Sequence, residues 1–245
     1  MLSQPSWRPE SVLRMLAGIF ACMLAGTLLI AAFNKLFVET GRVTEDQAKF
    51  FNLTVGMISF NCGILILAQW LVWEHGVTWG QAFGFRLAGL PNALALAAIV
   101  AVFAVPLSWL LGEFSGWVML QLHREVVAQP AVETLRKAVT TWQKIEFGVM
   151  AIAVAPFTEE VLFRGILYPA VRQFGRPRAS MWIISFLFAA YHASWMTLLP
   201  LTILAVILTL LYERTQTLAA PILCHSLFNL TNFIYLMHES GGFPR

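Results

Sequence analysis

The sequence is poor in charged residues. Of its 245 residues, 12% are Asp, Glu, Lys or Arg and 58% are hydrophobic, whereas a typical soluble domain has about 25% charged and about 45–50% apolar residues. So few charges cannot cover the surface of a water-soluble protein, and the high apolar content excludes a disordered chain. The mean hydropathy of +0.71 agrees, and the chain is therefore predicted to be an integral membrane protein.

Cysteine and clustered basic charge are scarce as well. Cys22, Cys62 and Cys224 lie in separate apolar runs without metal-ligand spacing, so they are predicted to be small buried side chains. The net charge is only +3, and the basic residues are scattered over short connections. This pattern excludes a nucleic-acid-binding stripe. With the N-terminus inside, seven Lys or Arg fall inside and eight outside, so the positive-inside rule gives no orientation.

Long apolar runs are what the sequence does contain. A helix needs about 20 apolar residues to cross the bilayer core, and the runs predict an all-α, polytopic bundle of about seven spans, with six to eight compatible. The expected spans are residues 15–37, 50–73, 91–111, 147–171, 181–195, 198–211 and 218–237. A polar stretch, residues 123–146, divides them. We expect an N-terminal part with the connecting segment (1–146), a C-terminal helical core (147–238) and a tail (239–245).

The ionisable residues inside the apolar runs are the informative ones, because such residues are rare in membrane spans and usually functional. The fourth run contains Glu159, Glu160 and Arg164. Glu160 and Arg164 are four residues apart and share a helix face, so they can pair. Glu159 points about 100° away, and only one of the two carboxylates is expected to be neutralised by Arg164. His192, His225 and Asn229 lie in later runs.

If these runs meet in the folded protein, a carboxylate, two imidazoles and a carboxamide lie in one cavity. This set of groups is chemically sufficient for hydrolysis. Burial disfavours a charged carboxylate and suits it to take a proton from water. Imidazole and amide groups can orient that water or stabilise an oxyanion. Alternatively, Glu159, His192 and His225 are a ligand set that zinc accepts, with the ion activating the water. Spacing does not decide between a zinc site and a metal-free glutamate mechanism.

In these residues the sequence resembles the CPBP family, also called the CAAX-protease or Abi family, of intramembrane proteases. The family pattern is Glu-Glu-x-x-x-Arg, Phe-x-x-x-His and His-x-x-x-Asn, and the chain carries all three elements in order between residues 145 and 235. The matching residues are Glu159, Glu160, Arg164, Phe188, His192, His225 and Asn229. The resemblance implies that Glu159 is the catalytic carboxylate and His192 its partner on the water. It further implies an oxyanion site at His225 and Asn229, with Glu160 and Arg164 in support.

The resulting hypothesis is an intramembrane endopeptidase whose Glu/His-activated water cleaves peptide bonds in or beside the bilayer. Its expected partners are a peptide or membrane-protein substrate and the lipid bilayer, and its expected location is the cell membrane of a prokaryote. One alternative is a catalytically silent membrane protein that binds a partner, for example in bacteriocin immunity. Another is a proton-coupled transporter, which is disfavoured because the polar groups cluster in the C-terminal half, with no matching set in the first three runs.

Overall fold

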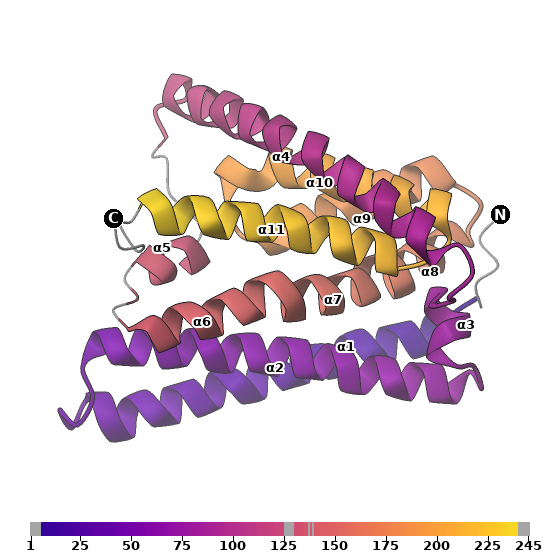
Figure 1. Cartoon of the computed structure of the whole chain (residues 1–245). Helices are drawn as coiled ribbons and strands as arrows, with labels where there is room; N and C mark the ends of the chain where they lie inside the picture. The colour runs from indigo at the N-terminus through magenta and orange to yellow at the C-terminus, as the bar shows by residue number, and fades with distance from the viewer. Residues whose placement is uncertain (1–5, 125–129, 137, 139, 240–245) are drawn as a thin grey trace.

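The computed structural model describes residues 6–124, 130–136, 138 and 140–239, which form helices and no strand. The segments labelled η are π-helical turns. In chain order the elements are α1 (Pro9–Phe33), η1 (Asn34–Val38), α2 (Glu45–Glu74), α3 (Trp79–Phe83), α4 (Leu90–Gln121), α5 (Pro130–Arg136), α6 (Thr141–Val149), η2 (Met150–Val154), α7 (Ala155–Glu160), η3 (Val161–Leu167), α8 (Tyr168–Arg172), α9 (Pro177–Tyr191), α10 (Trp195–Thr215) and α11 (Ala219–Glu239). The predicted helical bundle is confirmed (Figure 1).

In the described part of the chain, four helical stretches are long and apolar enough to cross a membrane: Pro9–Val38, Gln47–Glu74, Leu90–Gln121 and Trp195–Thr215. The other predicted spans are helical but do not belong to this group. For example, α9 has 15 residues and is about 22 Å long at 1.5 Å per residue, shorter than a bilayer core of about 30 Å. The predicted count of about seven is therefore not reproduced by length and hydropathy.

α1 and α2 form a close helix pair (Figure 1). A Cβ on Gly26 would collide with the side chain of Ser59, and a Cβ on Gly63 would lie 3.1 Å from Cys22 Cβ. Small residues allow such close approach, which is how helices associate in lipid. The prediction of buried cysteines is wrong for Cys62, which is exposed, and for the partly buried Cys22, whereas Cys224 is buried. An outward-facing apolar residue on a membrane helix contacts lipid and needs no protein core.

Residues 141–172 form one continuous helical path in which α-helical and π-helical turns alternate. Pro156 and Pro169 are each the second residue of a new α-helical stretch, α7 and α8. A proline has no N–H, so a carbonyl of the preceding turn loses its helical donor. Single π turns often occur at functional sites. Here they frame the segment that carries the two glutamates.

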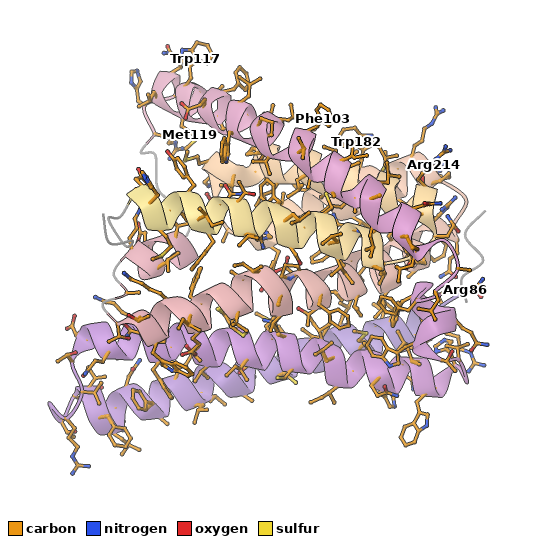
Figure 2. All side chains as sticks on the ribbon, in the orientation of Figure 1. Arg86, Phe103, Trp117, Met119, Trp182 and Arg214 are labelled. Atoms are coloured by element: carbon orange, nitrogen blue, oxygen red, sulfur yellow. The ribbon has the colours of Figure 1, made fainter. Side chains whose placement is uncertain are left out.

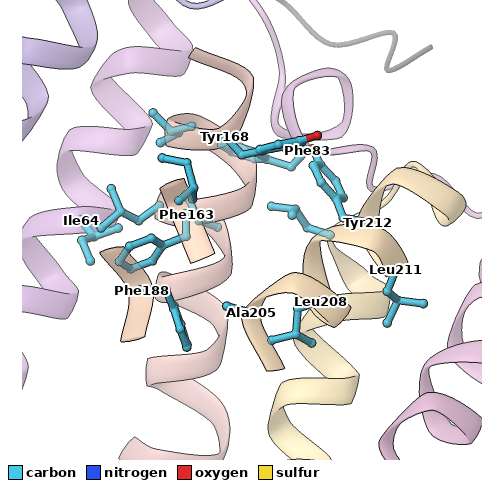
Figure 3. Close-up of a cluster of buried hydrophobic side chains, with 14 of the residues drawn as sticks. Ile64, Phe83, Phe163, Tyr168, Phe188, Ala205, Leu208, Leu211 and Tyr212 are labelled. Atoms are coloured by element: carbon cyan, nitrogen blue, oxygen red, sulfur yellow. The ribbon is translucent and has the colours of Figure 1, made fainter. Parts of the chain in front are cut away.

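We call residues 141–172, with their alternating α-helical and π-helical turns, the interrupted helix. It lies between α2 and α11 in Figure 1, and α7 contacts both of these helices. α10 packs against α4 and α9, and α4 also packs against α11. Figure 3 shows the apolar cluster where η3, α9 and α10 meet, with Phe163, Phe188 and Ala205 among its buried members. This cluster fixes the relative positions of the helices that carry the site.

The segment before α1 is fastened to the interrupted helix. Trp7 is 1% exposed, and its indole N–H donates to Gly165 O at 2.9 Å. Pro169, four residues after Gly165, cannot donate to that carbonyl because it has no N–H. Gln173 Nε2 donates to Trp7 O at 3.2 Å. The main-chain N–H of Arg8 donates to His75 Nε2 at 3.1 Å. Trp7 therefore completes the hydrogen bonding of η3.

Replacing Trp7 by phenylalanine is expected to lower the free energy of unfolding by about 1–3 kcal/mol, because Gly165 O becomes a buried acceptor without this donor. Thermal or SDS-induced unfolding of the purified protein in detergent measures the change. Trp73→Phe is the matched control, since Trp73 is 80% exposed. Equal stability losses in the two variants would contradict the assignment.

Candidate active site

The two adjacent glutamates lie at the end of α7, where the helix passes into η3. Glu159 is 7% exposed, and Glu160 and Arg164 are both fully buried. The four-residue spacing brings Arg164 Nη1 within 2.9 Å of Glu160 Oε1. The predicted pairing of Glu160 with Arg164 is therefore present, and Glu159 is the carboxylate that Arg164 leaves over.

Arg164 also fastens the helix to two neighbours. Its Nη2 donates to Ala205 O at 2.9 Å and its Nε to Thr209 Oγ1 at 3.4 Å, both on α10. Its guanidinium carbon lies 4.7 Å from the ring centroid of Phe188 on α9, a cation–π geometry. Each of the three guanidinium nitrogens thus has an oxygen partner, and the guanidinium group also lies next to an aromatic ring. This arrangement gives Arg164 a positioning role.

His225, on α11, lies between the two carboxylates. It is 3% exposed, and its Nδ1 is 3.0 Å from Glu160 Oε1. An ionised carboxylate only accepts hydrogen bonds, so Nδ1 carries the hydrogen and donates. The other ring nitrogen, Nε2, is 3.9 Å from Glu159 Oε2. Glu160 therefore fixes the orientation of the ring, and the ring presents Nε2 toward Glu159.

Glu159 differs from Glu160 in its partners. Within the described part of the chain, Glu159 makes no hydrogen bond, and its sole ion-pair contact is the 3.9 Å approach to His225. That distance is too long for a direct hydrogen bond. A buried carboxylate without a neutralising partner is costly in a structural role. The geometry therefore makes Glu159 the chemically available member of the pair.

His192 ends α9 and is half-buried. Its Nδ1 lies 2.8 Å from Phe188 O, and its ring centroid is 5.0 Å from that of Phe188. The Phe188 ring is in turn 5.7 Å from His225. No bond joins His192 to Glu159 among the described residues, so the structure brings His192 next to the site without direct contact. The sequence pattern contained Phe188, but its place between two imidazoles and Arg164 was not foreseen.

Asn229 follows His225 by one turn of α11. Its Nδ2 donates to Ala151 O in η2 at 2.7 Å. Ala155 N–H bonds instead to Met150 O, and Pro156 has no N–H, so the helix leaves Ala151 O without a donor. One amide hydrogen of Asn229 thus holds α11 to the interrupted helix, and the second is not committed to this bond.

A polar contact from α2 completes the site, through an asparagine in the middle of an apolar run whose partner the sequence did not identify. Thr158, directly before Glu159, donates its hydroxyl hydrogen to Asn61 Oδ1. Asn61 is 3% exposed and donates its own amide hydrogen to Met57 O at 2.7 Å. An amide in the middle of an apolar span is the signal that could have indicated this link, because such a group must find an interhelical partner.

The candidate zinc ligands are only partly gathered. Glu159 and His225 approach each other, whereas His192 is separated from them by Phe188. Within the described residues, no three His, Cys, Asp or Glu side chains are grouped so that they could hold a metal ion. The side chains as placed do not form a three-ligand site, so the zinc hypothesis stays a prediction and no chemical step is derived through it.

Comparison with known proteins bears on the same segment. Residues 141–231 match the family described as Type II CAAX prenyl endopeptidase Rce1-like. No curated protein and no solved structure matches the chain. The matched segment begins with α6, ends within α11 and contains every predicted site residue, whereas α1 to α4 lie outside it. Residues 141–231 therefore belong to the CAAX-protease (CPBP) family, a family of intramembrane proteases.

Proposed function

We propose that the chain is an endopeptidase that uses Glu159 to activate a water molecule for peptide-bond hydrolysis in or beside the bilayer. The observation that supports this most is the difference between the two glutamates. Glu160 is held by Arg164 and His225, whereas Glu159 is free to accept a proton and faces His225 Nε2 at 3.9 Å. One water oxygen can lie within hydrogen-bond distance of two atoms that far apart.

The hydrogen bonds suggest a role for each imidazole. Both His225 and His192 place Nδ1 against an oxygen acceptor, so Nδ1 carries the hydrogen and Nε2 of the neutral ring is an acceptor. An acceptor at Nε2 can orient the water by taking a hydrogen bond from it. Donation to an oxyanion requires the protonated ring or another group. The uncommitted amide hydrogen of Asn229 is such a group.

The proposed steps balance in protons. Glu159 takes one proton from the water while the oxygen attacks the peptide carbonyl, and negative charge develops on the carbonyl oxygen. Hydrogen-bond donors stabilise that charge. The protonated Glu159 then gives its proton to the leaving amine as the carbon–nitrogen bond breaks. The products are a free carboxyl end and a free amino end, and Glu159 returns to its starting state.

The proposal is tested by comparing the membrane peptides and membrane proteins of cells that contain the wild-type chain with those of cells that contain Glu159→Gln. Peptides that are produced only with the wild-type chain support it and also identify substrates. Identical peptide sets, together with a full phenotype of the Glu159→Gln variant, would instead support a partner-binding protein without catalysis.

Asn229 provides a separate test of the oxyanion site. Asn229→Ala is expected to lower kcat by roughly 10²–10³-fold, the usual effect of removing one oxyanion donor, and to reduce stability because Ala151 O loses its donor. Asn232→Ala is the matched control on the same helix, since Asn232 Nδ2 bonds Phe228 O at 2.9 Å. Initial rates per folded enzyme measure the effect. A kcat unchanged in Asn229→Ala would restrict Asn229 to a structural role.

A further inference from the structure

One end of the bundle gathers four segments that are distant in sequence. They are the residues before and at the start of α1, the connection from α2 through α3 to α4, the α8–α9 connection, and the α10–α11 connection. Gln173 Nε2 bonds Trp7 O at 3.2 Å, and Leu218 N–H bonds Phe83 O at 3.0 Å. Figure 1 shows α3 and α8 at this end, and Figure 2 shows Arg86 and Arg214 there.

The charge at this end is almost entirely arginine. The four segments contain seven arginines, three glutamates and none of the four lysines of the chain. Two of the glutamates form ion pairs with arginines: Glu74 with Arg14 at 2.6 Å, and Glu213 with Arg172 at 2.7 Å. Five exposed arginines form no ion pair within the described part of the chain. We call them the arginine end: Arg8, Arg86, Arg176, Arg178 and Arg214.

The rest of the chain offers no comparable excess of positive charge. Outside these four segments and the buried Glu159, Glu160 and Arg164, the sequence holds eight basic and eight acidic residues. A count of Lys and Arg alone misses this asymmetry, because it ignores the acidic residues beside them. The excess of positive charge therefore lies in the four segments at this end of the bundle.

Exposed apolar side chains alternate with the arginines. Leu87, next to Arg86, is 88% exposed, and Phe174, between Arg172 and Arg176, is 71% exposed. Large apolar groups next to guanidinium groups suit the boundary between acyl chains and headgroups, where the apolar part inserts and the charge stays at headgroup level. Such residues would be unfavourable in contact with water alone.

A cavity of about 190 Å³ opens at the same end, between the α3–α4 connection and the α10–α11 connection. Arg86 is the charged residue in its lining, and Thr215 and Thr217 supply hydroxyl groups. Guanidinium binds phosphate oxygens in bidentate fashion, and the hydroxyl of Thr217, whose oxygen accepts from Ala219 N–H at 3.3 Å, can donate its own hydrogen as well. The lining thus has the chemistry that a phosphodiester headgroup requires.

We propose that the arginine end binds the headgroups of anionic phospholipids, with one headgroup at the cavity of Arg86. Arginine without lysine favours phosphate over a general negative surface, because its planar fork matches phosphate geometry. An anionic leaflet attracts basic segments at its surface. The bundle is therefore oriented with the start of α1, the α8–α9 connection and the α10–α11 connection at the more anionic face of the membrane.

The test uses the full chain in nanodiscs of phosphatidylcholine with increasing phosphatidylglycerol, and native mass spectrometry counts the lipids that the protein retains. The variant R86Q/R176Q/R178Q removes three charges from the arginine end. The matched control K35Q/R42Q/R124Q removes three exposed basic charges from the other end of the helices. The preference for phosphatidylglycerol over phosphatidylcholine is expected to fall at least tenfold in the first variant, as interactions of this kind predict. It is expected to change less than twofold in the control.

Equal losses in the two variants would overturn the proposal, because they would reflect total charge and not the arginine end. An unchanged preference in R86Q/R176Q/R178Q would overturn it as well. Melting temperatures in detergent verify that both variants are folded, which exposed glutamine substitutions should leave intact. Neither measurement involves peptide hydrolysis, so the result does not depend on the proposed enzymatic activity.

Discussion

Replacing Glu159 by glutamine is expected to lower the rate of peptide hydrolysis by at least roughly 10³-fold, within the range that a general base contributes. Glutamine keeps the size of the side chain but cannot take a proton from water. The fold should survive, because Glu159 makes no hydrogen bond among the described residues and only approaches His225 at 3.9 Å. Rates per folded enzyme on a substrate found in the peptide comparison measure the effect.

A carboxylate elsewhere in the interrupted helix supplies the control. Glu146 accepts a hydrogen bond from Thr54 at 3.0 Å and lies more than three helical turns before Glu159, so Glu146→Gln should retain activity. In the same assay His192→Ala is expected to be inactive if His192 helps to orient the water. Normal hydrolysis by the folded Glu159→Gln variant would refute the proposed mechanism. Normal hydrolysis by His192→Ala alone would transfer that role to His225.

Much of the site could be predicted because helical periodicity is a strong constraint. The four-residue spacing of Glu160 and Arg164 predicted their pairing, and the structure has it at 2.9 Å. The expectation that one carboxylate would be left over also agrees. What spacing could not supply was the arrangement between helices. It did not show that His225 would lie nearer to Glu159 than His192, nor that Phe188 would lie between the two imidazoles.

The contributions of the N-terminal half were the hardest to foresee. Trp7 stands in a short polar stretch rich in proline, which resembles an exposed leader, and its burial depends on a carbonyl that Pro169 leaves without a helical donor. Such a need arises only when the two segments meet in three dimensions. The number of spans was not reproduced because an apolar run does not fix the length of its helix: α9 has only 15 residues, fewer than the roughly 20 that cross a bilayer core.

Arg164→Leu is expected to cause the largest loss of stability, about 3–5 kcal/mol, because it leaves the carboxylate of Glu160 buried without its cation. His225 alone would then contact Glu160, through one hydrogen bond at 3.0 Å. The variant also removes the donors to Ala205 O and Thr209 Oγ1. SDS-induced unfolding of the purified protein in mixed micelles measures the free energy, with Arg42→Leu, an exposed arginine, as the control.

The double variant Glu160→Leu/Arg164→Leu separates a buried charge from a lost contact. If the single variant is unstable because an uncompensated carboxylate is buried, removing that carboxylate should restore much of the stability, since apolar residues often replace a buried ion pair at little cost. If the loss reflects the bonds of Arg164 to α10, the double variant should be at least as unstable as the single one. Restored stability without restored hydrolysis would show that Glu160 and Arg164 orient His225 for catalysis. The double variant would then fold without the ion pair, but its His225 ring would lack the carboxylate that holds Nδ1 in place.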